Sequence, residues 1–388
     1  MTNYRQLKTA AKGYIERLIL PSDPLQPMWN RENFIFRKTA KWNYIDSCMI
    51  RSVLMLHELT GDERLLDYAK RFTSAYVTDS GEIPTMNPED FNLDNIAGGR
   101  NLLWLYRLTG EEKFLSGAHM LYNEQLLRQP RLNCGSYWHK AIYPNQLWLD
   151  GAYMALPFLA DYGIFTGDNS LVDDALHQAE NIRNIMQDKA SGLYYHGYDE
   201  TRSLIWADSK TGLSANFWLR SMGWLCAGLV ELYELTDDSA VGDMLQELLR
   251  SLAQRQQPRG MLLQLPALPH LPENYPETSG TLLFSYAALK ACRLGICDDT
   301  LKNAGMSALS AAGDFITINP DGFPVLRNVC LMGGLGGGQN RDGSADYYLS
   351  EKIVENDAKG IAPFLMAYTE MLRSEDAQIA NARFVKYE

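Results

Sequence analysis

The chain has 388 residues, of which 46% are hydrophobic and 11% aromatic, and its formal net charge is −11. This composition supports a large buried core and excludes a disordered chain. The acidic balance argues against nucleic acid as the main partner, because phosphate binding needs a basic face. No stretch approaches the roughly 18 apolar residues of a membrane span, so we expect no membrane segment. Nothing in the sequence indicates an obligate protein partner.

The cysteines and the first residues bear on the cellular compartment. Residues 1–14 contain no apolar segment of the signal-peptide type. Six cysteines are scattered, mostly through apolar stretches, and the nearest pair, Cys292 and Cys297, has no second pair with which to build a zinc site. We therefore expect buried thiols, no metal ion and a cytoplasmic protein.

Recurring turns mark the helix boundaries. Each turn begins with Thr and continues with Gly or Asp and then an acidic residue, at 60–62, 109–111, 166–168 and 236–238. Glycine ends one helix and the acidic residue caps the next. The turns recur every 49 to 70 residues, which is typical of a repeat of helical hairpins.

The helices on the two sides of each turn differ in polarity. The helix after a turn has one apolar stripe, as in Val241, Leu245, Leu248 and Leu252, whereas the helix before it is apolar nearly all round, as in 217–232. A helix without a polar face is enclosed on all sides. Outer and inner helices therefore alternate along the chain.

Twelve such helices predict an all-α fold, an (α/α)6 barrel in which six hairpins close into a ring. Their approximate ranges are 4–19, 42–60, 62–77, 94–109, 111–128, 147–166, 169–187, 215–235, 239–256, 279–295, 300–317 and 356–373. No flexible linker divides the chain, so we expect a single domain over residues 1–388. The intervening segments 20–40, 78–93, 129–146, 188–214, 257–277 and 318–355 are predicted to be long loops at one mouth.

Carboxylic acids with aromatic neighbours stand at the starts of two inner helices. Asp150 follows Trp148 by two residues, and Asp94 begins the preceding inner helix. An acid at a helix start is usually a plain cap, but a cap needs no tryptophan beside it. Apolar neighbours raise the pKa of a carboxyl group and a helix amino terminus lowers it. We therefore expect Asp150 to exchange a proton near neutral pH, with Asp94 as a second carboxylate.

Two loops and one inner helix carry further candidates. His139 and Lys140 follow two aromatic residues, and His196 follows two tyrosines. Arg220 lies on an almost wholly apolar helix, four residues before Trp224. A buried cation requires an anionic partner, which is Asp94, Asp150 or a carboxylate of the substrate.

Several segments together resemble glycoside hydrolase family 105, whose members are unsaturated rhamnogalacturonyl and related unsaturated uronyl hydrolases. These segments are 137–140, 146–151, 195–200, 206–208, 217–224, 341–351 and 355–360. The resemblance implies the (α/α)6 barrel, no metal or other cofactor, and Asp150 as general acid and base assisted by Asp94. It also implies sugar contacts by Tyr44, His139, Lys140, Trp148, His196, Trp218, Arg220 and Trp224. Residues 260–266 depart from the family pattern, which bears on substrate identity.

The activity implied by this resemblance is pectin degradation: release of the terminal 4,5-unsaturated uronic acid from lyase-generated oligosaccharides, with rhamnogalacturonan products as the expected substrate. Three alternatives remain open: a conventional glycosidase that uses Asp94 and Asp150 on saturated substrates, a sugar epimerase that uses His139 and His196, and a barrel that binds sugar without turnover. The first two differ from the implied activity in whether a C4=C5 double bond is consumed.

Overall fold

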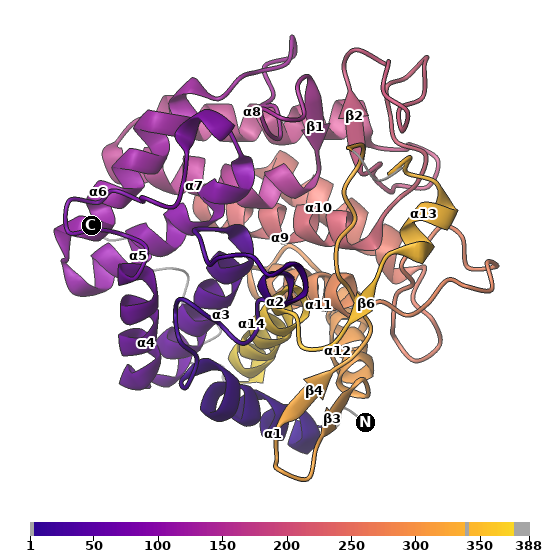
Figure 1. The fold of residues 1–388 in the computed structure, drawn as a ribbon. Helices are drawn as coiled ribbons and strands as arrows, with labels where there is room; N and C mark the ends of the chain where they lie inside the picture. The colour runs from indigo at the N-terminus through magenta and orange to yellow at the C-terminus, as the bar shows by residue number, and fades with distance from the viewer. Residues whose placement is uncertain (1–3, 338–340, 376–388) are drawn as a thin grey trace.

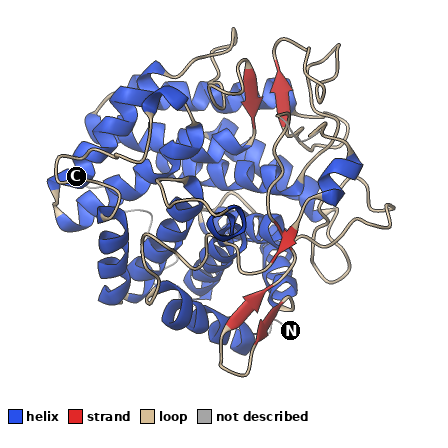
Figure 2. Ribbon diagram, in the orientation of Figure 1, coloured by secondary structure: helices blue, strands red, loops and turns tan. Residues whose placement is uncertain are grey.

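The computed structural model describes residues 4–337 and 341–375, and in these ranges six inner helices form a ring that six outer helices surround (Figures 1 and 2). The inner helices are α3 (Tyr44–Thr60), α5 (Gly99–Thr109), α7 (Asp150–Thr166), α9 (Leu219–Thr236), α11 (Thr278–Arg293) and α14 (Ala358–Glu375). The outer helices are α1 (Tyr4–Tyr14), α4 (Glu63–Ser74), α6 (Glu112–Met120), α8 (Asn169–Met186), α10 (Ser239–Ala253) and α12 (Asp299–Gly313).

The ring closes on itself. Each inner helix packs against the next one along the chain, and α14 packs against α3. Outer helices α4, α6, α8, α10 and α12 pack on the inner helix that precedes each of them, while α1 packs on α14. The first and last helices of the chain are therefore neighbours, and the predicted (α/α)6 barrel is confirmed.

Burial follows the alternation that the sequence predicted. Every residue of 219–232 in α9 is buried, whereas α10 buries one stripe that includes Val241, Leu245, Leu248 and Leu252. The short turns also form as expected. Gly61 ends α3 in the left-handed conformation with φ of 65°, and the Asp62 side chain accepts a hydrogen bond from the first turn of α4.

Ion pairs link the inner helices inside the ring. Glu231 of α9 is 1% exposed and contacts Arg51 of α3 at 3.5 Å and Arg100 of α5. Its carboxylate also accepts a hydrogen bond of 2.8 Å from the hydroxyl of Tyr286 in α11. One carboxylate thus joins four helices that are far apart in sequence.

A second group of charges lies near the carboxyl ends of the inner helices. Glu234 of α9 pairs with Lys290 and Arg293 of α11 at 2.7 and 3.1 Å. Arg293 also pairs with Glu370 of α14 at 2.7 Å, and Arg373 of α14 pairs with Glu58 of α3. On the remaining side, Arg107 of α5 pairs with Asp161 of α7 at 2.7 Å. The ion pairs therefore reach every inner helix.

The loops contain more structure than the sequence predicted. They hold two short helices, α2 (Arg31–Phe36) and α13 (Ala345–Ser350), and three antiparallel strand pairs. The pairs are β1 (Gln146–Trp148) with β2 (Gly197–Asp199), β3 (Ile316–Ile318) with β4 (Pro324–Leu326), and β5 (Val329–Cys330) with β6 (Ile353–Val354).

Some predicted helix starts were therefore wrong by a few residues. The sixth helix was expected from 147, but residues 147 and 148 belong to β1 because they pair with Tyr198 and Gly197. The fourth was expected from 94, but Leu93–Gly98 forms a 3-10 turn before α5 begins. Within the described ranges, no helix combines the length and apolar character that a membrane crossing requires.

Glu231 provides a test of the ion pairs inside the ring. We expect Glu231→Ala to lower the free energy of unfolding by about 3–5 kcal/mol, because two buried arginines lose their shared carboxylate. Chemical denaturation of both proteins measures the difference. The control is Glu247→Ala, which removes an exposed partner of Arg183 and should cost no more than about 1 kcal/mol. Equal effects of the two substitutions would contradict the structural importance of the buried group.

Candidate active site

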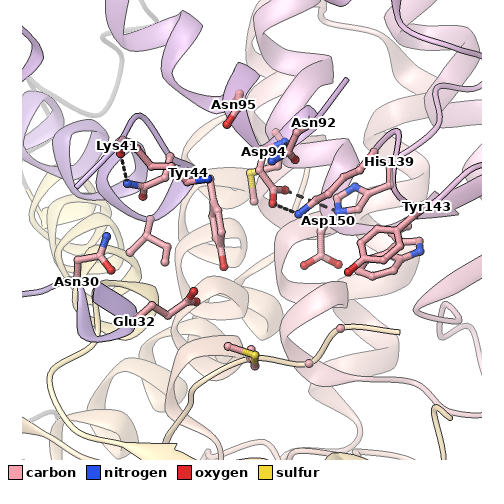
Figure 3. Close-up of a pocket in the computed structure, with 18 of the residues that line it drawn as sticks. Asn30, Glu32, Lys41, Tyr44, Asn92, Asp94, Asn95, His139, Tyr143 and Asp150 are labelled. Atoms are coloured by element: carbon pink, nitrogen blue, oxygen red, sulfur yellow. Dashed lines mark hydrogen bonds and ion pairs between the residues drawn. The ribbon is translucent and has the colours of Figure 1, made fainter. Parts of the chain in front are cut away.

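A cavity of about 250 Å³ lies at the mouth of the ring, where the inner helices begin (Figure 3). This volume is close to the lower end of the range of about 300–1,000 Å³ for small-ligand sites. Eight of the ten residues predicted for the site line it: Tyr44, Asp94, His139, Lys140, Trp148, Asp150, Trp218 and Arg220.

Asp150 is the first residue of α7 and directly follows β1 and Leu149. The Leu149 N–H donates to the carbonyl of His196, which itself precedes β2. This pairing brings Oδ2 of Asp150 to 3.2 Å from Nε2 of His196. His196 is fully buried, and the Asp150 side chain is 16% exposed. The carboxyl therefore faces the cavity while its contact with the imidazole lies behind it.

The protonation of Asp150 differs from the expectation of exchange near neutral pH. Burial raises the pKa of Asp150, but the contact with His196 and the charges of His139 and Arg220 together lower it below its usual value. The aromatic neighbours alone do not decide the balance, because three nitrogen-bearing side chains surround the same carboxyl. Asp150 is therefore a carboxylate in the free protein.

Aromatic rings hold both histidines in place. The ring of Trp148 stacks with His139 at 4.6 Å and with Tyr143 at 4.8 Å between centroids. His196 lies between Trp148, at 5.4 Å, and Trp218, at 4.8 Å. These rings give the wall beside Asp150 a flat apolar surface, which suits a sugar ring.

Asp94 lies in the 3-10 turn before α5 and forms an ion pair with Lys140. Nζ of Lys140 is 2.5 Å from Oδ2 of Asp94, and Nε2 of His139 is 3.7 Å from its Oδ1. The two segments meet because the Leu93 N–H donates to the carbonyl of His139. Figure 3 shows Asp94, Asp150 and His139 on one side of the cavity, with Glu32 of α2 across from them.

Arg220 is 2% exposed and lines the cavity. Its guanidinium donates to the carbonyls of Cys330 and Leu331 and to the Ser279 hydroxyl, and it lies 4.7 Å from the ring of Trp218. Among the described residues, no carboxylate lies within ion-pair distance of it. Asp94 and Asp150, two of the three anionic partners expected from the sequence, therefore do not pair with it directly.

Trp224 and His196 do not line the cavity. Trp224 is 1% exposed and packs behind it, at 4.8 Å from Tyr153 and 6.5 Å from Tyr44. Trp224 therefore packs against Tyr44, which lines the cavity. His196 reaches the site only through Asp150.

Several residues that line the cavity were not predicted. They are Asn30, Glu32, Asn33, Lys38, Thr39, Lys41, Trp42, Asn43, Ile45, Asn92, Asn95, Tyr143, Met154, Met332, Gly333, Gly334 and Arg341. Those of 30–39 belong to α2 and its flanks, a segment without helical periodicity in the sequence. Among the described residues, no group of three or more His, Cys, Asp or Glu is arranged to hold a metal ion.

A cleft of this kind, with carboxylates and stacked rings at the mouth of a helical ring, is typical of helical-barrel glycoside hydrolases. The comparison with protein families agrees. The chain belongs to Glycosyl Hydrolase Family 88, whose family model matches residues 25–375.

Individual relatives support the same assignment. A family 105 glycoside hydrolase from C. acetobutylicum ATCC 824 is 30% identical, with a TM-score of 0.85 over 95% of this chain and 99% of that one. Protein Atu3128 of Agrobacterium fabrum (strain C58) is 40% identical over 230 residues, which cover 56% of this chain and 98% of that protein. The unsaturated rhamnogalacturonyl hydrolase YesR of Bacillus subtilis (strain 168) is 22% identical over 307 residues, 74% of this chain and 84% of YesR. The resemblance to family 105 is confirmed.

His139 provides a pH test of the site. Burial lowers the pKa of His139 to about 4, although the charge of Asp94 opposes this, whereas an unfolded histidine titrates near about 6.5. The unfolded chain therefore binds the proton first as the pH falls. This contribution to stability is complete above about pH 6.5 and is lost as the pH falls towards about 4, by about 3 kcal/mol in all.

We expect His139→Gln to show a smaller loss of stability than the unsubstituted protein between about pH 7 and pH 4.5. Urea denaturation at both pH values gives the four free energies of unfolding that are needed. Because every other titrating group is common to the two proteins, only the difference between their pH slopes is attributed to His139. Parallel slopes would show that His139 titrates as it does in the unfolded chain.

Proposed function

We propose that the protein hydrolyses oligosaccharides that end in a 4,5-unsaturated uronic acid, with Asp150 as general acid and base. The observation that carries the proposal is the position of Asp150, at a helix start in an aromatic-walled cavity, in contact with His196. The family supports a glycoside hydrolase, and the similarity to YesR, an unsaturated rhamnogalacturonyl hydrolase, supports an unsaturated rhamnogalacturonyl substrate. A role in pectin degradation and a cytoplasmic location belong to the same proposal.

The proposed reaction uses the vinyl ether of the unsaturated ring. Asp150 in its acid form protonates C4, which leaves an oxocarbenium-like centre at C5. Asp150, now ionised, takes a proton from water as the water oxygen bonds to C5. The C5 hemiketal opens as its C5–O5 bond breaks, its hydroxyl proton leaves and the ring oxygen takes up a proton, so that C1 becomes a hemiacetal. This hemiacetal then expels the leaving sugar as an alcohol, which gives a keto uronate with an aldehyde at C1 and a shortened oligosaccharide. We assign the stabilisation of the positive charge at C5 to Asp94 and to the aromatic ring faces of the cavity.

Arg220 supports an anionic substrate in an acidic protein. Its charge is buried at the cavity wall and is met by backbone carbonyls and by Ser279, whose hydroxyl in turn donates to Glu277 at 2.6 Å. We assign it to the carboxylate of the uronic acid, because a planar guanidinium matches a carboxylate in geometry and charge. A cation at this position attracts the anionic substrate locally, although the net charge of −11 repels it at long range.

Asp150→Asn tests the general acid. The substitution keeps the shape of the side chain and removes its proton, so we expect the rate of loss of the enol-ether absorbance to fall by about 10²–10⁴-fold. Circular dichroism checks that the fold is retained. The matched control is Asp161→Asn, which makes the same change on the same helix, at the ion pair with Arg107. It should keep most of the activity, and full activity of Asp150→Asn would refute the assignment.

The same assay separates the alternatives. Saturated and unsaturated disaccharides are offered side by side, in D2O as well as in water. Hydration of the double bond removes the absorbance and places one deuterium on C4 of the keto uronate. A conventional glycosidase would cleave the saturated sugar and leave the double bond intact, and an epimerase would release no sugar. Binding without turnover would mark a non-catalytic barrel.

Arg220→Met tests the recognition of the carboxylate. We expect the unsubstituted protein to prefer the unsaturated disaccharide over its methyl ester by about 10–100-fold in kcat/KM, the value of a hydrogen bond to a charged group. Arg220→Met should reduce this preference to near unity. The substitution should lower kcat/KM for the unsaturated disaccharide with a free carboxylate and leave kcat/KM for its methyl ester almost unchanged. The control Lys38→Met removes a half-exposed cation that pairs with Glu32 at the same cavity, and it should keep the preference. An unchanged preference in Arg220→Met would place the carboxylate elsewhere.

A further inference from the structure

His196 is contacted at both ring nitrogens by groups from distant segments. Its Nδ1 lies 2.7 Å from the hydroxyl of Tyr348 in α13, and its Nε2 lies 3.2 Å from Oδ2 of Asp150 in α7. His196 and Tyr348 are both fully buried. A continuous line of polar contacts therefore runs from Tyr348 through the imidazole to the carboxylate.

The rings of this line are fixed by packing. Trp218 stacks on Tyr348 at 6.0 Å with an interplanar angle of 20°, and it also lies against His196 at 4.8 Å. Trp148 covers the other part of His196. The imidazole therefore has little freedom to turn, and the groups at its two nitrogens determine which nitrogen carries the proton of the neutral ring.

The hydrogen-bond inventory favours one tautomer. A tyrosine hydroxyl has a single proton, and among the described residues the Tyr348 hydroxyl has no acceptor other than Nδ1 of His196. If Nδ1 carried the proton instead, the buried O–H of Tyr348 would have no acceptor, and a lone pair on Nε2 would face the carboxylate. Buried polar groups left in this way are costly. Both ends of the line therefore favour the proton on Nε2.

We propose that Tyr348 is a positioning residue, which donates to Nδ1 of His196 and so holds the Nε2–H of that ring against the carboxylate of Asp150. The hydroxyl touches neither substrate nor cavity and acts through the imidazole. The consequence for Asp150 rests on the proposed function, whereas the tautomer of His196 does not. The charge on Asp150 is stabilised by an N–H that Tyr348 keeps in place.

Other charged or titratable groups also face the two ends of this line, and all of them except Tyr347 are unchanged in the variants below. His139 of the loop before β1 and Arg220 of α9 act on the carboxylate end, Asp150. Tyr347 of α13, Asp342 of the preceding turn and Cys330 of β5 surround Tyr348. Burial raises the pKa of Tyr348 well above its usual value, so its hydroxyl carries its proton at neutral pH.

The tautomer is measured directly by NMR with ¹⁵N-labelled histidine. The sequence contains six histidines, and the signals of His196 are those that His196→Gln removes. We expect the unsubstituted protein to show a protonated Nε2 and an unprotonated Nδ1 in His196. In Tyr348→Phe, which keeps the stacked ring, we expect this preference to weaken, because only the carboxylate of Asp150 then favours the proton on Nε2. A protonated Nδ1 in the unsubstituted protein would overturn the proposal, even if Tyr348→Phe failed to fold.

The pH dependence of kcat measures the consequence for Asp150. The acid form of Asp150 is needed for the proposed reaction, so kcat falls on the alkaline side of its pKa in the complex. Loss of a donor to the charged form raises that pKa. We expect Tyr348→Phe to move the alkaline limb upward by about 0.5–1 pH unit, because a short polar contact to the carboxylate is weakened.

The matched control is Tyr347→Phe. Tyr347 is the neighbour of Tyr348 on α13, and its hydroxyl donates to the carbonyl of Gly334 at 2.6 Å, away from His196. This variant should leave both the tautomer and the alkaline limb unchanged. A Tyr348→Phe protein with lower kcat and an unmoved limb would reduce Tyr348 to a structural role. If no variant consumes the unsaturated substrate, the proposed function fails, and the NMR result still decides the tautomer.

Discussion

The closure of the inner ring by α14 on α3 constrains the position of every side chain at the mouth. Six parallel inner helices in a closed ring have their amino ends on one face, and the loops that enter them converge there. The ion pairs inside the ring hold the helices in register, because Glu231 contacts α3, α5 and α11. Arg293 of α11 likewise joins Glu234 of α9 to Glu370 of α14. The cavity can therefore be built from the loops and single turns that enter the inner helices, without a rigid sheet of its own.

Backbone hydrogen bonds between the converging loops determine which side chains at the mouth contact one another. The β1–β2 ladder and the Leu149–His196 hydrogen bond set the distance between Asp150 and His196. The Leu93–His139 hydrogen bond does the same for Asp94 and Lys140. In both cases a backbone hydrogen bond one residue from the side chain decides the side-chain geometry. Two acids at the starts of adjacent hairpins, Asp150 in α7 and Asp94 in the turn before α5, thereby receive different partners, one an imidazole and the other an ammonium.

The helices were predictable from the sequence because their determinants are local. The Thr-Gly turns, the acidic caps and the two kinds of apolar pattern lie within single helices or single turns, and the ring follows from their alternation. The site was predictable in part. Eight predicted residues line the cavity, since residues at inner helix starts have only one mouth to face.

The missed features depend on contacts between distant segments. The strand β1 exists because of pairing with β2 some fifty residues later, and Tyr348 meets His196 across 152 positions of sequence. No local pattern carries such a pairing. The ionisation of Asp150 was missed for the same reason. Trp148 was visible two residues away, whereas His196 and Arg220, which lower the pKa, come from other segments.

Asp150 is ionised in the free protein, whereas the proposed reaction needs its acid form. The substrate itself can bring about this change by raising the pKa of Asp150. Asp150 is ionised while the cation Arg220 and the two histidines face it alone. On the proposed function, the carboxylate of the uronic acid binds beside Arg220 and offsets that positive charge. A second anion near Asp150 also disfavours its ionised form. Both effects raise the pKa of Asp150 when the substrate is in place, so the acid is formed where the vinyl ether is bound. The double bond that accepts the proton and the carboxylate that promotes proton uptake belong to the same sugar ring. A neutral sugar lacks this carboxylate and would leave Asp150 ionised.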